Sequence, residues 1–444
     1  MTADRDFGMS APDHAPEQLR QTWRRMPTDV RDTLSWLAHL LDASLPLRAA
    51  EDDDEFAQRH LGAAAGGLVA IRETLGPFTA PLVARLLAVD VRRHPPYDTA
   101  GLVSDESPAW ERLQVDDGTE TVPSALVAAF AAGTLLEVAA VLSIDTRWSS
   151  KEFVIHVGAA DAAVAERYVR GVLQRARGEG NYLRGRCLRV TGDDGRLAVE
   201  PVATPTATRE DVIVLPAVWA EIDLNLAALA DRRELLTRLG LGTNRGLLLV
   251  GPPGTGKSAL CRVLAAELAG DVTVVFCSAS AIGSHLREVY DEVARLSPAL
   301  VLLEDIDLVI GNRRRGAGLG LHDFLTALDG AMSSHQDVVT VATTNDVGAL
   351  DDAATRAARF DRIIDVPLPG PEQRSAILHR YLGPLAGSVD VTAVSRATDG
   401  ASGADLRELV RRAVLASGDE VTTGALLALV HGGAWSVGAT GHYL

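Results

Sequence analysis

The chain has 444 residues, 47% of them hydrophobic, and is therefore long enough for two or three domains with sizeable cores. Its formal net charge of −16 argues against a general nucleic-acid binder, because phosphate backbones demand a basic surface. Cys187, Cys261 and Cys277 form neither a paired framework nor a metal-ligand spacing, which is typical of a reducing compartment. We therefore expect a cytoplasmic protein.

The first half of the chain shows three kinds of segment. Residues 1–20 are polar and lack the apolar stretch of a signal peptide, so we expect a disordered tail there. Apolar residues recur at helical spacing through much of residues 21–118, which predicts a helical N-terminal region. Within it, the acidic run at residues 51–55 fits the solvated start of a helix better than a metal site. Residues 119–205 combine helix-like and strand-like segments and predict a small α/β module.

The most apolar segment, residues 123–144, is long enough to span a membrane. It contains Glu137 and lacks a flanking basic cluster, so we expect a buried helix and no membrane partner. His156 lies in an apolar strand-like run and is expected to be a hydrogen-bonded core histidine rather than a ligand. No H-E-x-x-H motif occurs, so the sequence does not support a fused zinc protease.

The strongest motif lies at residues 251–258, between an apolar strand-like run and a helical segment, and has the pattern G-x-x-x-x-G-K-[ST]. Its glycines let successive backbone N–H groups surround a phosphate, and the following helix adds its dipole. Lys257 is one of only two lysines in the chain, and its compact ammonium fits between phosphate oxygens. The motif therefore predicts a nucleotide site at Gly251, Pro252, Pro253, Gly254, Thr255, Gly256, Lys257, Ser258 and Ala259.

Strand-like and helical segments alternate from about residue 210, as in a three-layer domain with a parallel sheet. The apolar run at residues 300–303 ends in Glu304, Asp305 and Asp307. Because ligands of such sheets bind beyond the carboxyl ends of the strands, these acids are placed to hold Mg²⁺ and to activate water. We expect Ser258 to ligate the Mg²⁺ ion that arrives with ATP, and Glu304 to hold the same ion through water.

Together these motifs resemble those of AAA-family ATPases over about residues 210–435, roughly half of the chain. Residues 343–345 resemble the segment that positions the attacking water, which implies that role for Asn345. Residues 350–361 resemble the segment whose two arginines reach the γ-phosphate of a neighbouring subunit. The resemblance thus implies a ring, expected to be a hexamer, with Arg356 and Arg359 acting across its interfaces.

The resemblance also implies a small helical lid at residues 371–435, after an ATPase core at residues 210–370. The lid would carry the motif Ser-Gly-Ala-Asp-Leu at residues 402–406, whose backbone at Gly403 and Ala404 packs near the adenine.

Two departures from the family pattern affect the expected mechanism. The family order at the acidic motif is Asp then Glu, whereas this chain has Glu304 then Asp305, as in the branch resembling the mitochondrial Rieske-protein translocase. The position of the pore tripeptide is taken by residues 281–283, with Ala281 at the aromatic place, so threading by an aromatic residue is in doubt. Tyr290 follows, but its spacing places it in the next helix, where packing is the expected role.

We therefore expect an α/β protein: a P-loop NTPase core with a parallel sheet and a C-terminal helical lid, preceded by an α-helical and a small α/β region. The leading hypothesis is an ATP-hydrolysing ring that remodels a protein partner recognised by residues 1–205. The second is a nucleotide-dependent switch or scaffold with very low turnover. A nucleic-acid motor or clamp loader and a membrane-anchored translocase are weaker alternatives, which the net acidity and the absence of basic flanks oppose.

Overall fold

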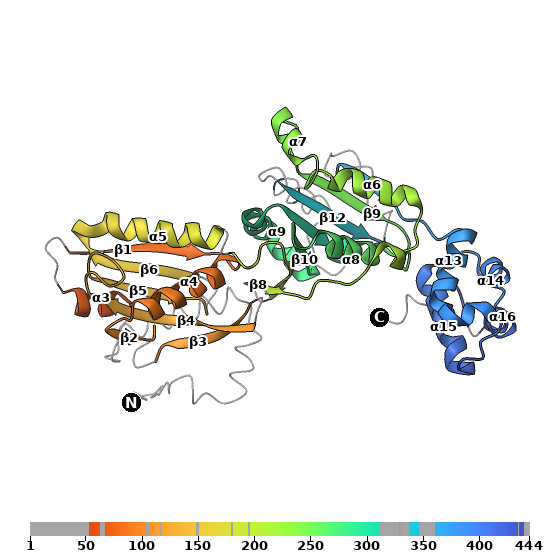
Figure 1. Ribbon diagram of the computed structural model, residues 1–444, viewed down its shortest axis with the longest axis horizontal. Helices are drawn as coiled ribbons and strands as arrows, with labels where there is room; N and C mark the ends of the chain where they lie inside the picture. Colours follow the sequence, from red (N-terminus) through yellow and green to blue (C-terminus); the bar gives the residue numbers. More distant parts are fainter. Residues whose placement is uncertain are drawn as a thin grey trace, which may run out of the picture.

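The computed structural model describes residues 53–438, apart from 63–66, 103–106, 116–117, 148–150, 179–180, 194–195, 311–327, 329, 331–336, 346–359 and 434. The described part contains two β-sheets and a C-terminal group of helices (Figure 1). The α/β class, the parallel sheet and the C-terminal helical region expected from the sequence are confirmed.

The N-terminal sheet has six strands, in the order β1-β6-β5-β4-β2, with β3 paired to β4, and every pairing is antiparallel. Its strands are β1 (Leu68–Leu75), β2 (Asp98–Ala100), β3 (Ala109–Val115), β4 (Gly118–Phe130), β5 (Ala140–Asp145) and β6 (Lys151–Gly158). Three helices pack on this sheet, namely α3 (Asp53–Leu61), α4 (Thr79–Arg93) and α5 (Ala162–Arg177). Helices α4 and α5 pack together, and α3 lies against β4, β5 and β6 with a small core of its own around Phe56 and Val141.

The sequence expectation of a helix at residues 123–144 was wrong: residues 123–130 belong to β4 and residues 140–144 to β5, and a turn joins them. Strand β4 is buried continuously from Val122 to Phe130, because α3 packs on it through one core and α4 through another. A strand covered on both faces is apolar at every position, so its sequence loses the alternation that separates strand from helix. In the described part of the chain, no helix is both long and apolar enough to span a bilayer.

The helical expectation for residues 21–118 was also incomplete. Their described part contains α3 and α4, but also strands β1, β2 and β3. Two expectations for side chains are confirmed, since Asp53 and Asp54 begin helix α3 and His156 is a buried, hydrogen-bonded residue of β6.

The second sheet has seven strands in the order β13-β9-β12-β11-β10-β7-β8, all parallel except β8. They are β7 (Cys187–Asp193), β8 (Arg196–Pro201), β9 (Arg245–Val250), β10 (Thr273–Cys277), β11 (Ala299–Leu303), β12 (Val338–Thr344) and β13 (Arg362–Asp365). The described helices of this region are α6 (Pro216–Leu226), α7 (Arg233–Leu239), α8 (Lys257–Leu268), α9 (Ala279–Val293) and α10 (Ile306–Ile310). All three cysteines are buried free thiols.

The sequence had suggested that strands β7 and β8 form one separate module with residues 119–186. The structure shows that they do not. Instead, β7 pairs in parallel with β10, so this hairpin extends the edge of the second sheet. The sequence could not show this, because pairing between residues almost ninety positions apart leaves no local pattern. The two sheets share one hydrophobic core, in which α4 packs near the end of α9.

The C-terminal helices are α13 (Pro371–Leu382), α14 (Val391–Ala397), α15 (Gly403–Ser417) and α16 (Thr423–His431). They enclose a third core around Leu378, Leu406 and Leu409 (Figure 1). Helix α15 begins with a capping box, in which the Ser402 hydroxyl accepts from the backbone N–H of Asp405 and the Asp405 carboxylate accepts from that of Ser402. This box holds the first turn of α15 in place.

Candidate nucleotide-binding site

The parallel strands bring three separate motifs to one edge of the second sheet. The phosphate-binding loop follows β9, Glu304 and Asp305 follow β11, and Asn345 follows β12. Since β9, β12 and β11 are neighbours, their carboxyl ends lie side by side. These residues are up to about ninety positions apart in the sequence, and they lie close together because their strands are neighbours in the sheet.

Glycine is required in the phosphate-binding loop by both backbone shape and close packing. Gly254 has a φ of 79°, a left-handed conformation that side chains disfavour. A Cβ atom on Gly254 would lie 2.6 Å from the Ser402 hydroxyl and 2.8 Å from the Ala404 Cβ atom. The loop therefore touches the start of α15 directly, and the backbone N–H of Ala404 donates to the Gly254 carbonyl at 3.2 Å.

Lys257 is 5% exposed, and its ammonium is held by the loop itself. The Nζ atom donates to the carbonyl oxygens of Gly251 at 2.7 Å and Pro252 at 2.9 Å. Burial lowers the pKa of Lys257, although the negative charges of Asp305 and Asp307 oppose this shift. The ammonium thus has a polar environment already and can exchange its carbonyl partners for phosphate oxygens.

The predicted Mg²⁺ ligands lie together. A hydrogen bond joins the Ser258 side chain to the Glu304 carboxylate. Burial raises the pKa of Glu304, against the Ser258 hydrogen bond and the positive charge of Arg262, which lower it. A hydroxyl and a carboxylate are oxygen donors of the kind that Mg²⁺ prefers, so these two residues fit the ion.

Asp305 and Asn345 form the other half of the acidic site. The Asn345 side-chain amide donates to the Asp305 carboxylate at 3.1 Å, and the backbone N–H of Asn345 donates to the Asp307 carboxylate at 3.1 Å. Asp305 has a φ of 51°, which is uncommon for a residue with a side chain, and its N–H donates to the Thr343 hydroxyl at 2.9 Å. These bonds orient the Asp305 carboxylate, and strained residues of this kind cluster at functional sites.

A cavity of ≈ 350 Å³ unites most of the predicted residues. From the phosphate-binding loop and the acidic motifs it is lined by Pro253, Gly254, Thr255, Gly256, Lys257, Ser258, Ala259, Asp305 and Asn345, and from α15 by Gly403 and Ala404. Gly251 and Pro252 contribute through their carbonyl bonds to Lys257, and Glu304 through its bond to Ser258.

The sequence interpretation missed seven residues that line the same cavity: Asp211, Val212, Ile213, Ile377, Arg380, Tyr381 and Arg407. They come from the segment before α6 and from helices α13 and α15. An ion pair of 2.8 Å between Asp211 and Arg380 connects the lid to the core. No spacing rule unites these positions, so only the folded chain reveals them.

The predictions for the two arginines and for the pore tripeptide have different outcomes. Arg356 and Arg359 lie outside the described residues, and their role stays a prediction. Ala281 and Ile282, at the position of the pore tripeptide, are fully buried in the first turn of α9, which Ser278 caps. The β7–β8 hairpin covers this turn, since the N–H of Gly192 donates to the Ser280 hydroxyl at 3.3 Å. This tripeptide position therefore presents no pore loop, and Tyr290 is buried by packing, as expected.

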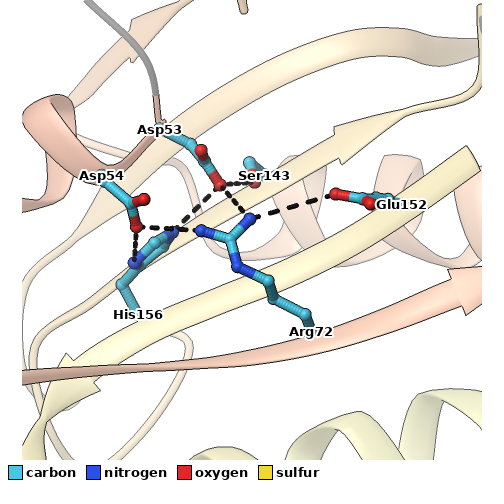
Figure 2. Close-up of polar contacts among 6 residues, drawn as sticks. All are labelled: Asp53, Asp54, Arg72, Ser143, Glu152 and His156. Carbon is cyan, nitrogen blue, oxygen red and sulfur yellow. Dashed lines mark hydrogen bonds and ion pairs between the residues drawn. The ribbon is translucent and has the colours of Figure 1, made fainter. Parts of the chain in front are cut away.

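A second polar cluster, far from this cavity in sequence, joins α3 to the N-terminal sheet (Figure 2). His156 is 2% exposed, and its two ring nitrogens lie 3.1 Å from the Asp53 carboxylate and 3.5 Å from that of Asp54. Arg72 lies against both carboxylates, and the Ser143 hydroxyl donates to Asp53. The possible ligand atoms of Asp53, Asp54 and His156 lie within 4.8 Å of one another, and the Arg72 guanidinium contacts both carboxylates, so the cluster ties α3 to strands β1 and β6.

Comparisons with known proteins agree with this geometry. Residues 247–368 match the family model described as "ATPase family associated with various cellular activities (AAA)". An ATP-dependent zinc metalloprotease FtsH of Marinobacter nauticus is 37% identical over 233 residues, covering 48% of this chain and 36% of the relative. The FtsH of Acidothermus cellulolyticus is 39% identical over 234 residues, covering 48% of this chain and 34% of the relative.

A third relative, the ATP-dependent zinc metalloprotease FtsH 3 of Sphaerobacter thermophilus, is 36% identical over 248 residues, covering 51% of this chain and 49% of the relative. The chain therefore spans about a third to a half of the length of these curated relatives. The matched segment contains the phosphate-binding loop, both acidic residues and Asn345, whose geometry was described above. Residues 247–368 of this chain are therefore similar to the ATPase domain of the AAA family.

Proposed function

We propose that this protein is an oligomeric ATPase that couples ATP hydrolysis to the remodelling of a protein partner bound by its N-terminal domain. One observation carries the proposal: Lys257, Asp305 and Asn345 line a single cavity next to the Ser258–Glu304 pair. This arrangement provides a phosphate cation, a pair of Mg²⁺ ligands and a carboxylate oriented by an amide. These are the parts that phosphoryl transfer to water requires.

The role of each residue follows from its contacts. Lys257 would leave the carbonyls of Gly251 and Pro252 to bind the β- and γ-phosphates. Ser258 and Glu304 would hold Mg²⁺, which supplies charge neutralisation on the phosphates when bound. Asp305 would accept a proton from the attacking water, while Asn345 holds the carboxylate in orientation.

The oligomeric part of the proposal rests on the resemblance of residues 350–361 to the family segment with two arginines. Arg356 and Arg359 of one subunit would stabilise the charge on the γ-phosphate held by its neighbour. The same resemblance supports a hexameric ring, and the cytoplasmic location that we propose rests on the three cysteines, which form no paired framework. The relatives are named as zinc proteases, but this sequence has no H-E-x-x-H motif, so we do not extend proteolysis to this chain.

The test is a subunit-mixing experiment on the full chain. Lys257→Ala removes the phosphate cation in its own site, and Arg356→Ala removes the charge given to the neighbour, so each variant alone should lose most ATP turnover. Mixed rings contain some sites in which both groups are intact, so mixing should restore measurable turnover. Arg238→Ala, an exposed change on α7, serves as the control and should leave turnover unchanged. If Arg356→Ala alone hydrolyses ATP at the wild-type rate, catalysis across subunits is wrong.

A second candidate function is a nucleotide-dependent switch with very low turnover. The supporting observation is Asp305, whose carboxylate is one methylene shorter than that of glutamate and starts from a strained backbone. Single-turnover hydrolysis by wild type and by Asp305→Asn separates the two functions. Equal rates in the two proteins would favour the switch.

A further inference from the structure

The outer face of the N-terminal domain is strongly basic, although the chain as a whole is acidic. Helices α4 and α5 carry seven arginines against two carboxylates, a net charge of +5, whereas the whole chain has a net charge of −16. Both helices pack on the N-terminal sheet and against each other (Figure 1). Their charges therefore gather on one surface of the domain.

Five of these arginines form what we call the arginine face: Arg92, Arg93, Arg167, Arg170 and Arg177. All five are exposed, and none forms an ion pair with a carboxylate among the described residues. The other two are already neutralised, since Arg85 pairs with Glu120 at 2.7 Å and Arg175 with Asp90 at 2.8 Å. Exposed like charges that are not held in ion pairs are available to an anionic partner, although Arg92 also interacts electrostatically with Glu120.

Apolar grooves lie between these charges. A groove of ≈ 460 Å³ at α4 is lined by Leu82, Leu86 and Val89 and by Ala176 of α5, together with Arg92 and the Arg85–Glu120 ion pair. Val89 is 37% exposed although it is aliphatic. The groove thus offers apolar side chains next to a neutralised ion pair and one further arginine, Arg92.

A second groove, of ≈ 290 Å³, lies on the other side of α5. Ile71, Val169 and Leu173 line it, together with Arg170 and Arg177. Its lining also contains Gln174 and two carboxylates, Glu73 and Glu166, so its two arginines are balanced, whereas the α4 groove has two arginines against the single carboxylate of Glu120. The stronger candidate for an acidic ligand is therefore the α4 groove, because its lining has a net positive charge while that of the second groove has none.

We propose that the arginine face and the α4 groove bind an acidic, leucine-rich segment of a partner protein. Arginine pairs with carboxylates through two parallel hydrogen bonds, and the groove would accept the aliphatic side chains between those carboxylates. A nucleic-acid backbone would leave the apolar side chains of the groove unused, and a membrane surface would require protruding apolar side chains rather than grooves. This inference rests on the proposed function and identifies the chemistry of its protein partner.

The test measures fluorescence anisotropy of a labelled peptide of Glu-Glu-Leu-Leu repeats with the full-length protein, without nucleotide. We expect saturable binding that weakens with salt, and about tenfold weaker binding when every leucine of the peptide is serine. The double variant Arg92→Glu/Arg170→Glu should lose about tenfold or more in affinity. The control Arg238→Glu/Arg396→Glu changes the net charge equally at exposed arginines of α7 and α14 and should bind as wild type.

Several results would overturn the proposal. Tighter binding of oligothymidylate or of phosphatidylserine vesicles than of the peptide would assign the face to another partner, and full affinity in Arg92→Glu/Arg170→Glu would remove the face from binding. If that variant does not fold, as judged by its circular dichroism, Arg92→Gln and Arg170→Gln replace it and should each weaken binding severalfold. ATP turnover of the same samples is measured separately, so an inactive wild type that still binds the peptide contradicts only the ATPase proposal.

Discussion

Lys257 and Asp305 line the same cavity with opposite charges, yet each is held by other groups of the protein rather than by the other. The ammonium of Lys257 is bound by two loop carbonyls, and the carboxylate of Asp305 by the Asn345 amide. This separation matters for catalysis, because a direct ion pair between them would have to break before phosphate could enter. The residues are arranged instead so that ligand binding replaces weak backbone contacts with charge-assisted ones.

Asp305→Asn should lower the single-turnover rate of ATP hydrolysis by about 10²-fold or more, because an amide cannot accept the proton of the attacking water. The affinity for ATP should change little, since Asp305 is not one of the expected Mg²⁺ ligands. Rapid-quench assays and nucleotide titrations on the same protein separate the two effects. A variant that loses affinity while keeping its rate would assign Asp305 to Mg²⁺ instead.

The affinity for Mg²⁺ and ATP should depend on pH in a bell shape. The pKa of Glu304 lies above 4.5, so its ligand carboxylate becomes protonated at a higher pH than in a free chain, and affinity falls on the acidic side. The pKa of Lys257 lies below 10.5, so its ammonium is lost earlier as pH rises, and affinity falls on the alkaline side. Calorimetric titrations across pH test this. Glu304→Gln should weaken binding at neutral pH and remove the acidic limb.

The first turns of helices α9 and α15 occupy two positions that were expected to matter for function. The first turn of α9 occupies the place of a pore loop, and the β7–β8 hairpin packs against it. The first turn of α15 is packed instead against the phosphate-binding loop. The β7–β8 hairpin thus covers the position of the pore tripeptide, whereas the capping box holds the first turn of α15 against the phosphate-binding loop.

Ala281→Tyr should destabilise the protein rather than create a threading loop. Ala281 is fully buried, and a Cβ atom on the neighbouring Gly192 would already lie 3.1 Å from its backbone. Overpacking of this kind costs about 1–3 kcal/mol or more. Urea unfolding measures the loss, and Ser280→Ala, a change in the same turn, provides a milder comparison. Unchanged stability with new translocation of an unfolded substrate would contradict the buried position.

Ser402→Ala should destabilise the lid and weaken nucleotide binding together. The Ser402 hydroxyl caps α15 and packs so closely on the loop that a Cβ atom on Gly254 would lie 2.6 Å from it, so its loss affects both the helix and its contact with the loop. Loss of such a cap costs about 1 kcal/mol. Thermal unfolding and ATP titration give the two quantities. Thr422→Ala removes the cap of α16, away from the cavity, and should lower stability alone.

At the scale of the whole molecule, the two sheets meet where α4 begins and α9 ends. Glu292 of α9 is 4% exposed, and its carboxylate accepts from the Thr79 hydroxyl at 3.3 Å and pairs with Arg295. A Cβ atom on Gly76 would lie 2.1 Å from this carboxylate, so the junction is closely packed. Because α9 follows β10, this junction, together with the shared core, joins the N-terminal sheet to the second sheet.

Glu292 should make the stability of the molecule fall as pH rises. Burial raises its native pKa above 4.5, so between that value and the native pKa the folded state holds a proton that the unfolded state has lost. More protons on the folded state mean that the free energy of unfolding decreases as pH increases through this window and then levels off. Urea unfolding at several pH values tests this, and Glu292→Gln should flatten the decrease. An equally steep decrease in the variant would assign it to other groups.

Several features were predictable from the sequence because they depend on local chemistry. The phosphate-binding loop needs its glycines and its lysine at fixed spacing, and the acidic residues must follow a buried strand, so both were identified in advance. The helical C-terminal region and Asn345 were found by resemblance to the same family. Residues such as Asp211, Tyr381 and Arg407 were missed, because they reach the cavity from three separate segments without a common pattern.

The sequence by itself therefore determined the chemistry of the phosphate end of the site, since backbone curvature and charge there are encoded in eight consecutive residues. Tertiary structure alone decided that residues 123–130 and 140–144 lie in strands, because burial on both faces removes the alternation from which a strand is recognised. It also decided that β7 and β8 extend the ATPase sheet and cover Ala281, since strand pairing depends on neighbours distant in sequence. The arginine face has the same origin: two helices far apart in the chain share a surface only after they pack on one sheet.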